Sequence, residues 1–174
     1  MVATGRPGTG GTAAGGTAGD EAAGGGAAGQ RPFGALVVRV ALVAQAVSTV
    51  AIGAWAAFAP RAFYDDFPGG GRAWVSADGP YNEHLVRDFG DLNLALALIL
   101  VVAAVTLGRP LVTAVAAGTL VYQGLHFVYH LRHLDVYDTG DQVGNVVAFV
   151  LAVTLPVVVL VAQARTPAPV GYRR

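Results

Sequence analysis

Residues 93–121 read NLALALILVVAAVTLGRPLVTAVAAGTLV, two long apolar runs separated only by Gly108, Arg109 and Pro110. Each run belongs to a hydrophobic span of at least the roughly 20 residues that cross a bilayer as a helix. A connection this short makes the two spans pack antiparallel. The stretch therefore predicts a transmembrane helical hairpin, around which the rest of the chain can be placed.

Two further hydrophobic spans flank this hairpin. The four predicted spans run from about 34 to 59, 82 to 107, 110 to 134 and 142 to 164. Pro156 lies inside the fourth span and should kink it, which membrane helices tolerate. No segment alternates with the period of a barrel strand. We therefore predict an all-α protein whose residues 32–165 form a four-helix transmembrane bundle.

The composition agrees with a membrane protein and excludes several functions. The 174 residues are 54% hydrophobic and only 13% charged, whereas roughly a quarter are charged in soluble domains. A net charge of zero without a basic patch argues against nucleic-acid binding. The absence of cysteine excludes disulfides, thiol redox pairs and cysteine metal sites. Residues 1–31 form a Gly/Ala-rich tract that we expect to be disordered, and 166–174 a short basic tail.

The distribution of charge predicts an orientation in the membrane. Seven of the eleven arginines fall on the side of the two termini and the second connection, whereas nine acidic residues fall on the opposite side. Basic residues are in excess at the cytoplasmic flanks of membrane helices. Both termini are therefore predicted to lie in the cytoplasm.

Ionisable residues recur with spacing i, i+4, i+7 on the second and third spans. The six residues are His84, Asp88, Asp91, His126, His130 and His133. This spacing keeps each row of three on one stripe of its helix. In an antiparallel hairpin, residues at equal depth have nearly constant sums of their numbers, which opposes Asp88 to His130. Ionisable groups inside a bilayer are costly unless paired, so we predict a functional cluster between these spans near the outer face.

One hypothesis for this cluster is a metal site. Two histidines one helical turn apart make a good chelate, and aspartates from the neighbouring helix would add the oxygen ligands that suit zinc, iron or manganese. All six residues are candidate ligands, and Asn145 of the fourth span could complete the coordination shell. Candidate catalytic residues are Asp88, Asp91 and His130. Haem is less favoured, because its two axial ligands must approach from opposite faces and no haem motif is present.

Two other hypotheses use the same residues differently. The rows could act as protonatable relays or ligand contacts in a binding or transport subunit, or as hydrogen-bonding glue in an accessory subunit without catalysis. The loop around Pro68 and the three glycines that follow could be a lid, with Tyr64 and Trp74 as contacts, or an interfacial loop anchored by aromatic rings. The partners expected are the lipid bilayer and a second copy of the chain.

Four motifs carry a resemblance to a known family. They are Pro60-Arg61-Ala-Phe63-Tyr64, Gly79-Pro80-Tyr81-Asn82-Glu83-His84, Arg87-Asp88 and Tyr129-His130-Leu131-Arg132-His133. Over residues 33–163 the chain resembles uncharacterised bacterial four-span membrane proteins that are broadly similar to the DoxX-like superfamily. The resemblance implies a multi-pass protein of the bacterial inner membrane but supplies no substrate. The thiol or quinone redox chemistry suggested for some DoxX-like proteins is not implied, because this chain has no cysteine.

Overall fold

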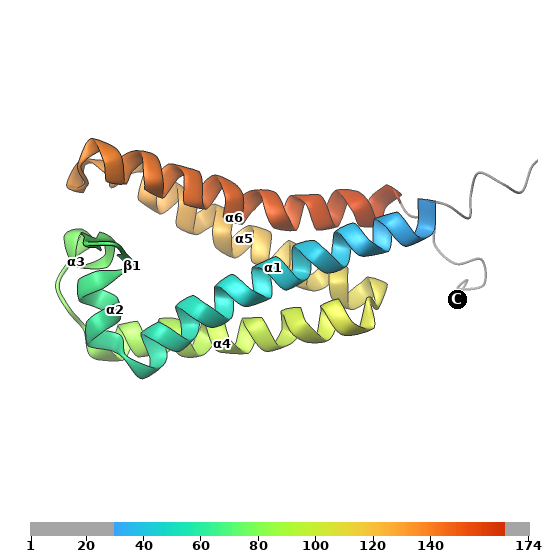
Figure 1. Ribbon diagram of the computed structural model, residues 1–174, viewed down its shortest axis with the longest axis horizontal. Helices are drawn as coiled ribbons and strands as arrows, with labels where there is room; N and C mark the ends of the chain where they lie inside the picture. The colour runs from blue at the N-terminus through green and yellow to red at the C-terminus, as the bar shows by residue number, and fades with distance from the viewer. Residues whose placement is uncertain (1–29, 166–174) are drawn as a thin grey trace, which may run out of the picture.

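A computed structural model describes residues 30–165 (Figure 1). Its elements are α1 (Gln30–Phe58), α2 (Pro60–Asp66), β1 (Pro68–Gly69), β2 (Arg72–Ala73), α3 (Trp74–Asp78), α4 (Glu83–Thr106), α5 (Arg109–Leu131), η1 (Leu134–Val136) and α6 (Thr139–Arg165). The helix α1 includes the last two residues of the tract predicted to be disordered. The rest of that tract and the predicted basic tail lie outside the described residues.

The predicted four-helix transmembrane bundle is confirmed. Four helices are long and apolar enough to cross a membrane, and they cover Phe33–Phe58, Glu83–Thr106, Arg109–Leu131 and Thr139–Arg165. The third ends three residues earlier than expected, where the carbonyls of Tyr129 and His130 accept from the backbone N–H groups of Arg132 and His133. The helix α6 continues through Pro156, whose side chain is buried.

The tightest helix contact joins α1 to α4, where two glycines remove the side chains that would keep the backbones apart. A Cβ atom on Gly90 would lie 2.4 Å from the backbone nitrogen of Ala57, and one on Gly53 would lie 3.0 Å from the Cβ of Asn93. Small residues at such crossings let membrane helices pack through their backbones. This contact therefore fixes how α4 is rotated about its own axis.

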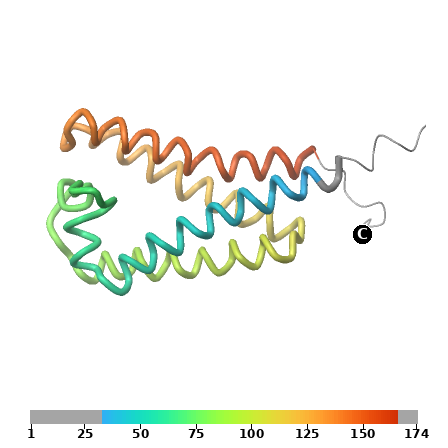
Figure 2. The backbone as a smooth tube through the Cα atoms, viewed as in Figure 1, coloured from blue at the N-terminus to red at the C-terminus, as the bar shows by residue number. Residues whose placement is uncertain are grey.

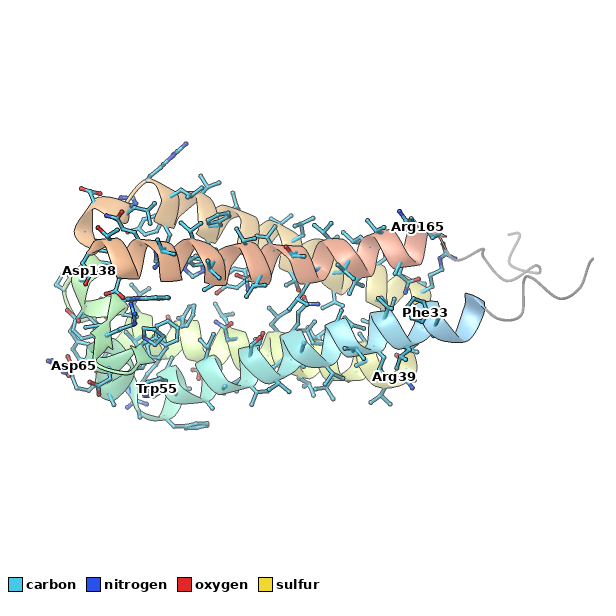
Figure 3. The ribbon with its side chains drawn as sticks, turned by 45° about the horizontal axis from the view of Figure 1, so that its top comes forward. Phe33, Arg39, Trp55, Asp65, Asp138 and Arg165 are labelled. Atoms are coloured by element: carbon cyan, nitrogen blue, oxygen red, sulfur yellow. The ribbon has the colours of Figure 1, made fainter. Side chains whose placement is uncertain are left out.

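The other two helices form a second pair. The helices α5 and α6 run side by side, and α1 also contacts α6. Figures 1 and 2 show that the α5–α6 pair separates from the α1–α4 pair toward the end where α2 and α3 lie. We call that end the cap end. The opposite end, where Figure 3 labels Phe33 and Arg165, is the terminal end.

Arginine side chains tie the carboxyl ends of three helices to their neighbours. Arg39 Nε donates to the carbonyl of Ala104 near the end of α4, at 3.0 Å. Arg109 Nη2 donates to Gln163 near the end of α6, at 2.9 Å, and Arg87 Nη1 donates to Ala57 at the end of α1, at 2.6 Å. The last carbonyls of a helix lack partners within the helix and carry a partial negative charge. A cation from an adjacent helix therefore satisfies and stabilises each end.

Residues 60–78 fold into a compact segment, which we call the cap, at the cap end of the bundle. Its short strands pair antiparallel through Gly69 and Arg72, and the turn between them uses Gly70 and Gly71 with φ of 67° and 79°, a conformation that side chains disfavour. Phe63 anchors the cap on the α1–α4 pair, since its ring lies 5.8 Å from Trp55 and 5.8 Å from Phe89. The sequence predicted this segment only as a loop.

The interior of the bundle changes character along its length. Toward the terminal end the core is apolar and includes the fully buried Leu42, Leu100, Val112 and Val159. The buried polar side chains lie nearer the middle and the cap end. They are Gln45, Thr49, Asn93, Thr119 and Asn145. The buried core of the terminal half is therefore an apolar plug, and the buried polar side chains of the described residues lie outside it.

Candidate functional site

The first predicted row, on α4, lies on the outside of the bundle. His84 Nε2 lies 3.3 Å from the Asp88 carboxylate one turn away, and the two side chains are 86% and 53% exposed. Asp91 is exposed as well. No hydrogen bond or ion pair among residues 30–165 joins this row to the histidines of α5. The predicted pairing of the two rows is therefore wrong.

The reason is the rotation of α4. The side chains that α4 turns toward α5 are Phe89, whose ring lies 6.4 Å from that of His126, and Asn93, whose amide lies 3.5 Å from the Tyr122 hydroxyl. At about 100° per residue, the stripe of His84, Asp88 and Asp91 lies on the opposite side of the helix. Spacing within a row fixed the stripe and the depth, but the close approach of Gly90 to α1 decided which way the stripe points.

The second row splits as well. The Nε2 atoms of His126 and His130 lie 3.0 Å apart, so one imidazole donates to the other. His133 turns away, with its Nδ1 2.8 Å from the carbonyl of Tyr129 and its ring stacked on Tyr129 at 4.1 Å. The pair of His126 and His130 is half-buried between α4, α5 and α6 and is the part of the prediction that lies inside the bundle.

This donor set does not fit a closed metal centre. Catalytic zinc sites use three protein ligands and structural sites use four. The described residues contain no group of three or more His, Cys, Asp or Glu side chains that could hold a metal ion. The histidine pair supplies two nitrogen donors, and the predicted aspartate ligands point to the other side of α4.

Aromatic rings enclose the histidine pair. Phe149 of α6 has its ring 4.8 Å from His126 and 4.7 Å from His130, and it stacks on Phe127 at 5.7 Å. Tyr122 contacts His126 from the side that faces the middle of the bundle, and Phe89 contacts it from α4. We refer to these rings and the two histidines as the histidine–aromatic cluster. Its members are Phe89, Tyr122, His126, Phe127, His130 and Phe149.

Several buried polar atoms near this cluster have no protein partner. Asn145, one turn before Phe149 on α6, is 1% exposed, and neither its Oδ1 nor its Nδ2 has a hydrogen-bond partner among the described residues. The same holds for His130 Nδ1 and for Gln45 Oε1. A buried polar atom without a partner costs roughly 1–3 kcal/mol, so each such atom calls for a bonding partner such as a water or a ligand.

The gap between α4 and α5 provides space next to the cluster. A cavity of about 150 Å³ is lined by Phe89, Leu92, Leu96, Asn93 and Tyr122. Asn93 donates to the carbonyl of Phe89 and to the Tyr122 hydroxyl, which leaves the hydroxyl proton of that tyrosine able to donate. An enclosed apolar cavity of about this volume holds a benzene ring, and this cavity is partly open.

The cap covers the cluster from the cap end. Trp74 lies against α6, since a Cβ atom on Gly144 would lie 3.1 Å from its ring, and its carbonyl accepts from the Tyr137 hydroxyl at 3.1 Å. Arg72 forms an ion pair with Asp141 at the start of α6. These contacts link the cap to the α5–α6 pair, so one segment bridges both helix pairs.

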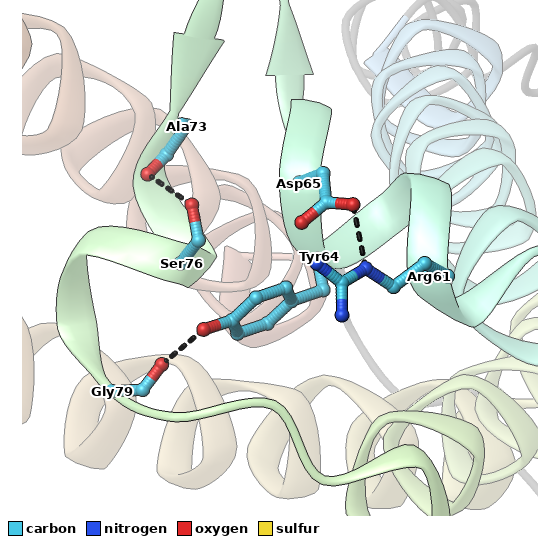
Figure 4. A network of polar contacts seen from close by, with 6 residues as sticks. All are labelled: Arg61, Tyr64, Asp65, Ala73, Ser76 and Gly79. Carbon is cyan, nitrogen blue, oxygen red and sulfur yellow. Dashed lines mark hydrogen bonds and ion pairs between the residues drawn. The ribbon is translucent and has the colours of Figure 1, made fainter.

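In the cap, an ion pair lies within α2, and one hydrogen bond joins α2 to the residue that follows α3. Figure 4 shows Arg61 paired with Asp65 at 2.7 Å and the Tyr64 hydroxyl donating to Gly79 at 2.7 Å. Trp74 therefore reaches α6, whereas Tyr64 is a structural contact within the segment. The structure places Trp74 against α6 and Tyr64 against the end of α3, and the lid and the interfacial anchor both stay predictions.

Asp78 at the end of α3 is an acidic residue whose charge acts on the histidine pair. Its carboxylate interacts electrostatically with His126, His130 and Tyr129. Burial, followed by the charge of Asp78, raises the pKa of Tyr137 to about 12. The phenol therefore stays protonated to a higher pH than an ordinary tyrosine, which preserves its hydrogen bond to the Trp74 carbonyl.

Sequence reasoning missed Asp78 and Asn93 as members of this region, and it missed Gln45 as a buried amide of α1. The amides had a usable signal, because a lone amide in a long apolar span faces the bundle interior rather than lipid. Asp78 had none, because only the fold of the cap brings it beside α5. The start of α4 is set by contacts close in the chain, since Asn82 Oδ1 accepts from the N–H of Leu85 and Glu83 pairs with Arg87 at 2.9 Å.

Comparison with known proteins gives no match to a family model, to a curated protein or to a solved structure.

Proposed function

We propose that this protein is a membrane-embedded binding protein for a small, uncharged, ring-bearing molecule with both a hydrogen-bond donor and an acceptor. The observation that carries the proposal is Asn145, a fully buried amide whose two polar atoms lack a partner among the described residues. It lies one turn from Phe149, the ring that packs on both histidines of the pair. An amide in this setting offers one donor and one acceptor to a planar ligand.

The chemistry of the region supports a neutral ligand. The buried polar residues of the described chain are all uncharged. An anionic molecule would have to leave water and would find no buried positive side chain at this depth, and the charge of Asp78 would repel it, which is costly. The surrounding rings of Phe89, Phe149 and the histidine pair favour a flat, unsaturated ligand, which stacks or packs edge-on against them.

The apolar plug in the terminal half favours binding over conduction. Leu42, Leu100, Val112 and Val159 are fully buried there, so the polar half is closed at its inner end. A blind-ended polar region lets a ligand enter and leave from the cap end or through the gap between α4 and α5. This supports a binding subunit rather than a conduit across the membrane.

The proposal is tested with three ring compounds on the full chain in lipid nanodiscs. Benzamide is neutral and complements an amide, benzoate adds a charge, and toluene lacks hydrogen-bonding groups. We expect calorimetric titration to give saturable binding of benzamide, with benzoate and toluene at least about tenfold weaker. One lost hydrogen bond of about 1.4 kcal/mol corresponds to tenfold in affinity.

Variants locate the binding. Asn145→Leu should weaken benzamide binding about tenfold, whereas Thr154→Val on the same helix should leave it unchanged, because the Thr154 hydroxyl is already bonded to the Val150 carbonyl. Equal binding of all three compounds, or wild-type binding by Asn145→Leu, would contradict the proposal.

A metal-dependent enzyme built on the predicted histidines and aspartates is not favoured, because the described donors do not form a group of three. The DoxX-like resemblance also stays a prediction. It agrees with a four-span bundle but adds no ligand to the proposal.

We further propose the orientation that the charges predict, in a bacterial inner membrane with both termini and the α4–α5 turn in the cytoplasm. The chain contains no cysteine, so single cysteines can report on each side. In intact cells, Ala77→Cys in the cap should react with a membrane-impermeant maleimide, whereas Thr106→Cys at the end of α4 should react only after permeabilisation. Both positions are exposed. The reverse labelling pattern would overturn this orientation.

A further inference from the structure

A groove of about 700 Å³ lies on the outside of the α1–α4 pair, away from the histidine–aromatic cluster. Valines and alanines make up its walls, and Arg39 is the charged residue among those that line it. Figure 3 places Arg39 toward the terminal end of the bundle, near Phe33. The groove is therefore an apolar channel along the surface of the bundle with a cation at one end.

Arg39 has bonding capacity beyond its structural role. Its Nε donates to the Ala104 carbonyl, which uses one of the five N–H donors of the guanidinium. Within residues 30–165 no carboxylate lies within ion-pair distance of it. An exposed guanidinium beside apolar membrane surface favours an anion that brings its own apolar part.

The dimensions of the groove match one leaflet of a bilayer. Its α1 wall runs from Arg39 to Ala51, twelve residue steps or about 18 Å at the rise of a helix. Half of a hydrocarbon core of roughly 30 Å is about 15 Å. The α4 wall, Val101 to Val105, lies at the end that holds Arg39. The groove thus begins at the cation, six residues into the Phe33–Phe58 span, and ends at Ala51, a little past the midpoint of that span.

We propose that this groove binds an anionic phospholipid of the leaflet at the terminal end. The phosphate accepts hydrogen bonds from the terminal nitrogens of Arg39, and one acyl chain lies along Val43, Val47 and Val50. A helix from a second copy is the other apolar occupant of such a surface. The spanning helices of the described residues carry their carboxylates toward the cap end, so a helix of a second copy packed in the groove would bring no anion to Arg39.

The proposal is tested on the full chain in nanodiscs that contain equal amounts of dioleoylphosphatidylglycerol and dioleoylphosphatidylcholine. Native mass spectrometry after release counts the lipids that stay bound. We expect phosphatidylglycerol to be retained at least about fivefold over phosphatidylcholine. Arg39→Gln should abolish this preference, while Arg165→Gln, which removes another exposed arginine at the same end, should keep it.

A second variant separates lipid binding from the role of Arg39 at the end of α4. Val47→Phe fills the groove and leaves Arg39 in place, so it should lower retention of phosphatidylglycerol about fivefold. Val121→Phe on α5 is the matched control, because Val47 and Val121 are 64% and 62% exposed. Equal retention of both lipids, or equal effects of Arg39→Gln and Arg165→Gln, would overturn the proposal. A dimer that Val47→Phe dissociates without a change in bound lipid would instead assign the groove to a second copy.

Discussion

Gly90→Ala is expected to cause the largest loss of stability among single substitutions in the bundle. A methyl group there would lie 2.4 Å from the Ala57 nitrogen and 2.8 Å from the Gly53 carbonyl oxygen, both of them backbone atoms that cannot rotate away. The helices α1 and α4 must therefore separate. Overpacking of this kind costs about 1–3 kcal/mol and sometimes more. Equilibrium unfolding in detergent micelles would measure the loss.

The control for this substitution is Gly118→Ala on α5. A Cβ atom at Gly118 meets nothing within 4 Å, and alanine is the better helix former. We expect unchanged or slightly raised stability. If Gly90→Ala unfolds at the same denaturant concentration as wild type, the α1–α4 crossing described above is incorrect.

Asn145→Leu is expected to raise the free energy of unfolding by about 1–3 kcal/mol in the absence of ligand. The substitution replaces a buried amide that has no partner among the described residues with an apolar side chain of the same branching. Removing an unsatisfied polar group removes its desolvation penalty. The measurement is unfolding of wild type and variant side by side in the same micelles.

This result separates a binding role from a structural one. If Asn145 held the bundle together through hydrogen bonds between helices, Asn145→Leu would lower stability. If Asn145→Leu is more stable than wild type and also loses benzamide binding, Asn145 has a binding role. This is the result expected of a site that is incomplete without its ligand. A less stable variant would assign Asn145 to packing and would remove the main support for the proposed function.

The spacing of the ionisable residues predicted where the two rows lie along their helices, but not the direction in which their side chains point. Depth was predicted well, because both rows lie toward the cap end and His126 and His130 do approach each other on one stripe. The direction of the side chains was not predicted well. A helix with exposed apolar side chains on most of its sides has no amphipathic pattern that would indicate its rotation. Leu92 and Leu98 of α4 are 71% and 65% exposed, for example, so lipid-facing and core-facing positions have the same chemistry.

The sequence by itself determined the number of spans, their approximate ends, the hairpin at Gly108 and the local cap at Asn82, because these depend on apolar length and on contacts between residues close in the chain. The tertiary structure alone decided which face of α4 meets α5, and it brought Asp78 and Trp74 over α5 and α6. These depend on one close backbone contact at Gly90 and on the fold of the cap. The length of each helix follows from the length of its apolar segment, whereas its rotation depends on which backbones can come into contact.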